Sequence, residues 1–196
     1  MIVTVAHNKG GVGKTTVAMH VAGLLAKRGK TVLLDGDPNR SALAWLARGP
    51  GLPFAVHDER MASRIARQFE HVVIDTEARP NEEDLKVLAS GCDLLLVPTF
   101  VDALSLQPLG ELVPVLRQVG ARNYRVVLNA VPPVGGAAAD AAALLAADDI
   151  PVAKTRIRRF AAYVNAANHG QLVYQVKDRK AEDAWKDYRA LAKELL

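Results

Sequence analysis

The sequence contains a single cysteine, Cys92, and no apolar run that approaches the roughly 20 residues of a membrane-spanning helix. One cysteine excludes an internal disulfide and fits a reducing compartment such as the cytoplasm. The five histidines lack the spacing of metal ligands, so we assign none of them chemistry. The first residues already form an apolar strand, which argues against a cleaved signal peptide. These absences exclude a disulfide-stabilised scaffold, a membrane-spanning protein and a histidine-based metal site.

Acidic residues are absent between Asp149 and Asp178, although the net charge of the whole chain is only +4. Residues 1–150 carry 15 Lys or Arg against 16 Asp or Glu, whereas residues 151–196 carry 10 against 5. The acid-free stretch contains Lys154, Arg156, Arg158, Arg159 and Lys177. A local excess of cations of this kind is typical of a surface that binds a polyanion.

The 196 residues suit one α/β domain, and we expect a single domain over residues 1–196 without a long linker or an internal repeat. Apolar runs alternate with helical patterns, which predicts a mostly parallel central sheet with helices on both faces. The predicted strands are Ile2–Ala6, Thr31–Asp35, Val72–Asp75, Asp93–Pro98 and Tyr124–Asn129. The predicted helices are Thr15–Arg28, Ser41–Ala47, Glu59–Gln68, Asn81–Ala89, Ser105–Val119, Ala137–Ala147, Arg158–Asn168 and Ala181–Leu195.

A glycine-rich P-loop joins the first predicted strand to the helix that follows it. The loop reads Lys9-Gly10-Gly11-Val12-Gly13-Lys14-Thr15-Thr16. Its glycines allow backbone N–H groups to close around phosphate oxygens, and the helix N-terminus adds the positive end of its dipole. In such a loop Lys14 reaches the β- and γ-phosphates, and the Thr15 hydroxyl ligates Mg²⁺. The motif therefore predicts that this chain binds a nucleoside triphosphate together with Mg²⁺.

A second lysine at the start of the loop, Lys9, has no fixed role in an ordinary P-loop, because Lys14 already neutralises the phosphates. With Lys9, the loop resembles the deviant Walker A motif of the ParA/MinD superfamily, whose members position plasmids, chromosomes, division proteins and other large cargo. The resemblance implies that Lys9 crosses a dimer interface to touch the nucleotide of the partner subunit. Iron–sulfur carriers, nitrogenase-type reductases and arsenite pumps of this superfamily use paired cysteines, which are missing here.

An acidic segment follows the second predicted strand, at the sheet edge where α/β folds bind ligands. Asp35-Gly36-Asp37-Pro38-Asn39 resembles the Asp-x-Asp-Pro-Gln segment of the superfamily, with Asn39 in place of the usual glutamine. The resemblance implies that Asp37 positions or activates the attacking water and that Asp35 supports the Mg²⁺ shell. The alternative is that both carboxylates only cap the following helix.

The third predicted strand ends in an acid, which is the form of a Walker B motif, so Asp75 is expected to hold Mg²⁺ through a water. The next residues, Glu77-Ala78-Arg79-Pro80, depart from the Asp-Thr/Cys-Pro-Pro pattern of the superfamily, which leaves the roles of Glu77 and Arg79 open. Asn129, at the end of the fifth predicted strand, matches an asparagine that contacts the adenine base in many relatives. A plain turn at the strand end is the alternative there.

Together these resemblances imply a slow ParA-type ATPase, with Lys9, Lys14 and Asp37 as its catalytic residues and ATP and Mg²⁺ as its cofactors. Such a protein dimerises with ATP, binds DNA without sequence preference and is released when a ParB-type adaptor on the cargo stimulates hydrolysis. We expect Arg156, Arg158 and Arg159 to contact DNA, and we expect the protein in the cytoplasm, on the nucleoid. The cargo stays open among a plasmid, a chromosome region and another large assembly.

Two other functions stay open. The final predicted helix is amphipathic, like the membrane-targeting helix that ends MinD relatives. Its polar face mixes acids with bases, whereas membrane-binding helices have a strongly basic face, so we favour docking on the protein body. A metabolic ligase resembling dethiobiotin synthetase would use the same ATP-binding scaffold, but such enzymes lack a cation equivalent to Lys9 and need a second substrate pocket.

Overall fold

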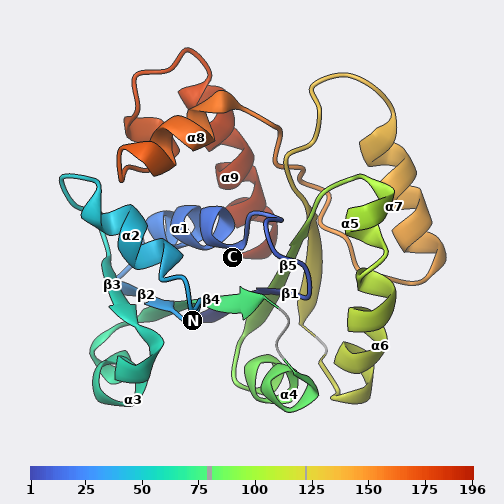
Figure 1. The fold of residues 1–196 in the computed structure, drawn as a ribbon, viewed down its shortest axis with the longest axis horizontal. Helices are drawn as coiled ribbons and strands as arrows, with labels where there is room; N and C mark the ends of the chain where they lie inside the picture. Colours follow the sequence, from blue (N-terminus) through green and yellow to red (C-terminus); the bar gives the residue numbers. More distant parts are fainter. Residues whose placement is uncertain (79–80, 122) are drawn as a thin grey trace.

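A six-stranded parallel sheet forms the centre of the computed structural model, which describes residues 1–78, 81–121 and 123–196 (Figure 1). The strand order across the sheet is β3-β2-β4-β1-β5-β6. The strands are β1 (Ile2–His7), β2 (Thr31–Asp35), β3 (Ala55–Asp58), β4 (His71–Ala78), β5 (Leu94–Thr99) and β6 (Tyr124–Leu128). The predicted fold class is confirmed, and all five predicted strands are present.

The edge strand β3 was missed by the sequence-based prediction. It has only four residues and pairs with β2 alone, with Val32 opposite Ala55 and Asp35 opposite Asp58. A strand this short leaves no long apolar run in the sequence. Its importance lies in Asp58, which it brings beside the end of β2.

Helices cover both faces of the sheet (Figure 1). One layer contains α1 (Lys14–Leu25), α2 (Ser41–Ala47), α8 (Ala161–Asn168) and α9 (Ala181–Leu195). The opposite layer contains α3 (Ala62–Ile65), α4 (Glu82–Ser90) and α6 (Leu109–Gln118), and α7 (Ala137–Ala147) packs with α6 against β5 and β6. Along β5, Leu94 and Leu96 face the first layer, whereas Leu95 and Val97 face the second. This alternation explains why the strands read as continuously apolar.

Three predicted helices differ from the observed ones. The pattern at residues 105–119 forms two helices, α5 (Ala103–Leu106) and α6, because Asp102 caps a first short turn and Pro108 starts a new helix. The pattern at residues 59–68 splits into the short turns η1 (Glu59–Met61), α3 and η2 (Ala66–Gln68). The helix predicted from Arg158 begins instead at Ala161, because the backbone of Arg158 pairs with Val131 in a parallel bridge.

An aromatic cluster around His20 joins the C-terminal layer to α1. The His20 ring is fully buried and stacks on Tyr188 with ring centres 4.6 Å apart. Its Nδ1 bonds the Thr16 carbonyl at 2.7 Å, and its Nε2 accepts from the Val173 N–H of η3 (Val173–Gln175) at 3.1 Å. Because both ring nitrogens are used and burial lowers the pKa of His20 to about 4, the ring is neutral and structural.

The final helix α9 lies on the protein body. Its apolar positions, including Trp185, Tyr188 and Leu191, are buried in the core cluster shared with α1 and the sheet. The predicted docking of this helix on the protein body is confirmed. Among the residues that the structure describes, no helix is long and apolar enough to cross a bilayer.

Candidate functional site

The P-loop connects β1 to α1 and has the backbone geometry of a phosphate cradle. Gly11 and Gly13 adopt positive φ angles of 78° and 93°, which glycine tolerates without strain. At Gly13 a side chain would also collide with the amide of Asn129, so this position has two reasons to be glycine. The loop ends at the N-terminus of α1, whose first N–H groups point out of the helix toward any bound anion.

A cavity of about 490 Å³ opens in front of this loop. It is lined by the P-loop, by the loop after β2 and by Glu77 at the end of β4. Its lining residues are Gly10, Gly11, Gly13, Lys14, Thr15, Thr16, Asp37, Pro38, Asn39, Ser41 and Glu77. Six of the eight predicted P-loop residues therefore face one polar cavity, while Val12 is buried behind the loop.

Lys14 is the buried cation of the cavity. Burial lowers the pKa of Lys14 from its usual value, and the carboxylates of Asp75 and Asp37 oppose that shift. A buried ammonium has few water molecules around it, so it interacts strongly with a phosphate bound beside it. The position therefore suits the role that the P-loop motif predicts.

Asp75 is the most unusual group of the site. It is fully buried, and neither carboxylate oxygen accepts a hydrogen bond from any residue that the structure describes. Burial raises the pKa of Asp75 to about 7; the neighbouring Thr15 hydroxyl opposes this shift, and the nearby Asp35 carboxylate adds to it. Buried carboxylates are normally satisfied, so an orphaned one beside a P-loop threonine has the character of a cation ligand. The Asp75 oxygens and the Thr15 hydroxyl are the hard oxygen ligands that Mg²⁺ prefers, so these residues fit the ion.

The carboxylate of Asp35, in contrast, accepts hydrogen bonds from nearby backbone N–H groups. One oxygen accepts the Asp37 N–H at 3.1 Å, and the other accepts the Leu43 N–H of α2 at 2.9 Å. These bonds anchor both ends of the loop after β2, which is the capping role left open for this residue. Support of a Mg²⁺ shell by Asp35 stays a prediction.

Asp37 lines the cavity and is held by its own loop. One of its oxygens accepts the Asn39 N–H at 2.8 Å and the Asn39 side-chain amide at 3.0 Å. The other accepts the Ser41 hydroxyl at 3.4 Å. No partner from a distant element fixes this carboxylate among the described residues, so the direction in which it points depends on the loop conformation.

Lys9 does not line the cavity of its own chain. Its ammonium donates to the Leu104 carbonyl at 3.1 Å and to the Ser105 hydroxyl at 3.0 Å, both in α5. Asp102 in turn accepts from the Ser105 hydroxyl at 2.8 Å. Sequence reasoning missed this contact because 96 positions separate Lys9 from Ser105.

His7 is a second residue that sequence reasoning missed. Its Nδ1 accepts the Lys9 backbone N–H at 2.8 Å, so the end of β1 holds the start of the P-loop. The ring is buried, and its pKa falls to about 4 because of burial and the nearby Lys14 and Lys9. The only sequence feature that could have marked His7 as part of the site was its position between the first strand and the P-loop.

Asn129 contacts the P-loop from the end of β6. Its side-chain amide donates to the Val12 carbonyl at 2.8 Å, and the residue is almost fully buried. The structure thus gives Asn129 a role in shaping the loop, and its predicted contact with the adenine base stays a prediction. Glu77 faces the cavity, as noted above, whereas Arg79 lies outside the described residues.

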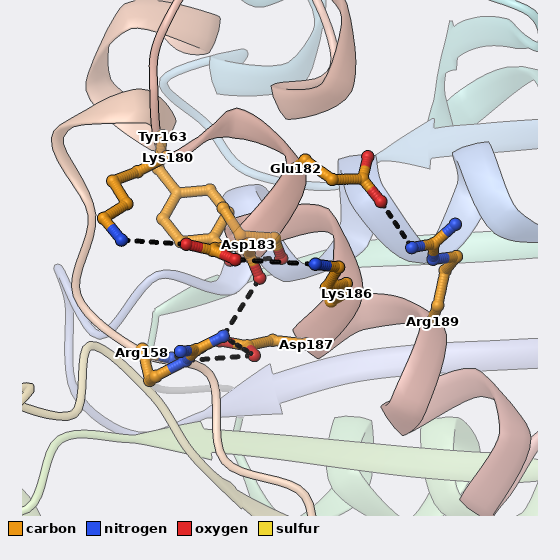
Figure 2. Close-up of polar contacts among 9 residues, drawn as sticks. Arg158, Tyr163, Lys180, Glu182, Asp183, Lys186, Asp187 and Arg189 are labelled. Carbon is orange, nitrogen blue, oxygen red and sulfur yellow. Dashed lines mark hydrogen bonds and ion pairs between the residues drawn. The ribbon is translucent and has the colours of Figure 1, made fainter.

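The predicted basic stretch divides into two kinds of arginine. Arg156 and Arg159 are exposed, and within residues 1–78, 81–121 and 123–196 neither has a carboxylate at ion-pair distance. Arg158 points the other way and pairs with Asp187 of α9, with its Nη2 2.7 Å from one oxygen (Figure 2). Its backbone N–H and Nε also donate to that carboxylate. The prediction that Arg158 contacts DNA stays a prediction, but its guanidinium already has a partner.

Acidic residues of α9 lie close to the acid-free stretch between Asp149 and Asp178. On α9, Asp183 pairs with Lys180 at 2.9 Å and with Lys186 at 3.7 Å, and Glu182 pairs with Arg189 (Figure 2). Most of the cations on the exposed side of α9 are therefore neutralised locally. Among the described residues, exposed cations without an ion-pair partner remain in the acid-free stretch, including Arg156 and Arg159 before α8 as well as Lys154 and Lys177.

Comparison with known proteins places the chain among ATP-binding relatives. The profile of the AAA_31 family, described as an AAA domain, matches residues 1–163. A protein of Gloeobacter kilaueensis named maintenance of carboxysome distribution protein A is 33% identical over 201 residues, which cover 99% of this chain and 93% of that protein.

Solved structures share the fold over nearly the whole chain. A variant of McdA from Cyanothece, in complex with ATP, superposes with a TM-score of 0.75 at 16% identity, over 99% of this chain and 95% of that one. The cell division protein MinD of Aquifex aeolicus superposes with a TM-score of 0.72 at 18% identity, over 100% and 98% of the two chains.

Proposed function

Because this chain belongs to the AAA_31 family and to the ParA/MinD superfamily of P-loop ATPases, we propose that it is an ATP-dependent positioning switch. It binds ATP with Mg²⁺, dimerises face to face over two nucleotides and binds DNA without sequence preference as a dimer. An adaptor of ParB type on the cargo stimulates its slow hydrolysis and releases it from DNA. The full-length similarity to a carboxysome distribution protein favours a large protein assembly over a plasmid as the cargo.

The observation that carries this proposal is the orphaned carboxylate of Asp75 beside the P-loop. Thr15 and Asp75 would hold Mg²⁺, which would neutralise phosphate charge. Lys14 contributes the second positive charge, and the P-loop amides surround the phosphate oxygens. Asp37, which faces the same cavity, orients the attacking water.

Dimerisation uses Lys9 as the link between the subunits. Within one chain its ammonium rests on α5, next to Leu104, whose side chain is 73% exposed. In the dimer Lys9 exchanges hydrogen bonds to an uncharged carbonyl and an uncharged hydroxyl for a contact to the negatively charged phosphates of the other nucleotide. A twofold dimer gains two such contacts, so dimerisation depends on bound nucleotide.

DNA binding relies on cations that the protein does not neutralise itself. Arg156 and Arg159 meet this condition, and phosphate contacts need charge rather than base-reading geometry. The affinity for DNA falls steeply with salt for the same reason. The membrane-binding alternative has less support, because the apolar face of α9 is buried.

Co-sedimentation with DNA and with anionic liposomes tests the proposal. The parent protein sediments with DNA in the presence of ATP and Mg²⁺, not with ADP, and does not sediment with liposomes. The double variant Arg156→Glu/Arg159→Glu binds ATP but loses DNA. The matched control Lys186→Glu/Arg189→Glu makes the same charge change on α9 and retains much more DNA binding, because these cations are already paired.

Two results would contradict the proposal. ATP-dependent sedimentation with liposomes would indicate a MinD-like membrane switch. DNA binding that is equal with and without ATP, or equally reduced in both double variants, would remove the nucleotide switch or the assigned surface. Arg158 is left out of the test, because replacing it also breaks the ion pair with Asp187.

A further inference from the structure

The loop that carries Asp37 ends in a strained residue. Arg40 has φ 52° and ψ 43°, a left-handed conformation that glycine adopts freely and side-chain-bearing residues avoid. Among the described residues only Ala130 and Asp149 share a positive φ without being glycine. Strain of this kind persists only where the surroundings hold it, and it gathers at functional sites. Arg40 lies three residues after Asp37, and its N–H donates to the Asp37 carbonyl at 2.8 Å.

The side chain of Arg40 supplies the contacts that hold this conformation. Its Nη1 donates to the Asp35 carbonyl at 2.9 Å, at the end of β2. Its Nη2 lies 3.1 Å from Asp58 Oδ2, at the end of β3. Because Asp35 and Asp58 are opposite each other in the sheet, one guanidinium joins two adjacent strand ends. The loop is therefore fixed to the rigid sheet at its far end as well as at its start.

From these contacts we infer that Arg40 is a positioning residue for Asp37. The inference rests on the proposed function, in which Asp37 orients the attacking water. Among the described residues the Asp37 carboxylate bonds only to Asn39 of the same loop and to Ser41 at the start of α2, so its direction follows the loop and its junction with α2. Arg40 sets that direction by tying the loop to β2 and β3. Neither its residue type nor its spacing marked it in the sequence.

A neighbouring arginine provides the control for a simple ion pair. Arg60 binds the same Asp58 carboxylate, with Nη2 at 2.7 Å and Nε at 3.0 Å from its oxygens, but its side chain is 74% exposed. It makes no hydrogen bond to the Asp37 loop among the described residues. Hydrogen bonds from Arg60 and the charge of Arg40 hold the pKa of Asp58 at about 2, so this acid stays ionised throughout any assay. Loss of either arginine removes one cation from Asp58, yet only Arg40 touches the loop.

The test compares steady-state ATP hydrolysis of the full-length parent with three variants. Arg40→Gly removes the guanidinium and the backbone strain together, so its melting temperature equals or exceeds that of the parent. Its kcat nevertheless falls by about tenfold or more, because a displaced catalytic group loses much of its effect. Its KM for ATP changes by less than about twofold, since the P-loop is untouched. Arg40→Lys, whose single ammonium replaces the two guanidinium nitrogens that contact Asp35 and Asp58, has an intermediate kcat, and Arg60→Ala matches the parent.

Hydrogen exchange of the nucleotide-free proteins gives a readout that does not depend on catalysis. In Arg40→Gly the amides of Asn39 and Leu43, which bond to Asp37 and Asp35, exchange faster than in the parent, whereas Arg60→Ala leaves them unchanged. If the parent shows no ATPase activity, or if Asp37→Ala keeps it, the proposed function fails while the exchange result still judges the loop anchor. The inference is overturned if Arg40→Gly keeps the parent kcat, if its loop amides stay as protected as before, or if Arg60→Ala lowers kcat equally.

Discussion

Two buried carboxylates, Asp75 at the P-loop and Asp187 in the C-terminal layer, have opposite surroundings. Asp187 accepts the Arg158 backbone N–H at 3.0 Å and is clamped by its guanidinium, so its charge is fully used inside the protein. Asp75 is more deeply buried and has no hydrogen-bond partner among the described residues. A satisfied buried acid stabilises a fold, whereas an unsatisfied one indicates that a ligand completes the site.

The same contrast extends to the histidines and the backbone of the two regions. His20, in the C-terminal layer, uses both ring nitrogens, but the buried Nε2 of His7 has no partner within the described residues. The left-handed residues Gly11, Gly13 and Arg40 also lie around the cavity. Unsatisfied buried groups and left-handed residues therefore meet at the P-loop, which is the pattern expected of a functional site, although the buried Tyr188 hydroxyl of the C-terminal layer also has no partner among the described residues.

The largest effect is expected at Asp37, where activity and stability should separate. Asp37→Ala lowers ATP turnover by about a hundredfold, in the range seen for loss of a positioned acid–base group, because it removes the carboxylate that orients the attacking water. It keeps ATP binding and changes the melting temperature little. Phosphate release and binding of a fluorescent ATP analogue measure the two properties, with Lys14→Ala as the control that loses both. Turnover at the parent rate would remove Asp37 from the mechanism.

In the C-terminal layer we expect a smaller effect, which changes stability and leaves ATP binding unchanged. Arg158→Ala leaves Asp187 partly buried without its cation, so we expect it to reduce the free energy of unfolding by about 2 kcal/mol. Binding of ATP is unchanged, because the P-loop is on a different part of the sheet. Arg189→Ala breaks an exposed pair on the same helix and costs less than about 0.5 kcal/mol. Urea titration measures both, and equal losses would contradict the distinction.

The smallest effect concerns the direction in which the ionisation of Asp75 changes the stability of the folded protein. Its folded-state pKa of about 7 lies above the value of 3.8 for a free side chain, so the folded protein holds the proton more tightly. Stability therefore falls as pH rises from about 4 to about 7 and is not lost further above that range. Asp75→Asn escapes this penalty but keeps a buried polar group without a partner, so we expect its melting temperature without nucleotide to exceed that of the parent by only about 3 °C at pH 8.

The pH dependence supplies the control for this prediction. His7 and His20 have folded-state pKa values of about 4, below the usual 6.5, so they destabilise the protein as pH falls through that interval. Both proteins contain these histidines, so their contribution cancels in the difference between variant and parent. Mg²⁺ with ATP should stabilise the parent more than Asp75→Asn. A variant that is less stable than the parent at pH 8 without ligand would show that Asp75 is a structural acid.

The features that could be predicted from the sequence are those that depend on the pattern of neighbouring residues. Continuous apolar runs located five strands, and the P-loop spacing located Lys14 and Thr15 in the cavity, because local chemistry decides both. Contacts between segments that are far apart in the sequence could not be predicted from it. The partner of Arg158 lies 29 residues away on α9, and the α5 contact of Lys9 lies further still. Arg40 was missed because its conformation follows from β3, a strand too short to recognise.

The central claim is that nucleotide and second subunit complete one site, and light scattering of the parent and of Lys9→Ala tests it most directly. Without nucleotide both proteins should have the monomer mass of 21.1 kDa. With Mg²⁺ and a non-hydrolysable ATP analogue, the parent should double in mass, whereas Lys9→Ala binds the analogue and stays monomeric. A Lys9→Ala protein that dimerises as the parent does, or a parent that stays monomeric with saturating analogue, would contradict the account.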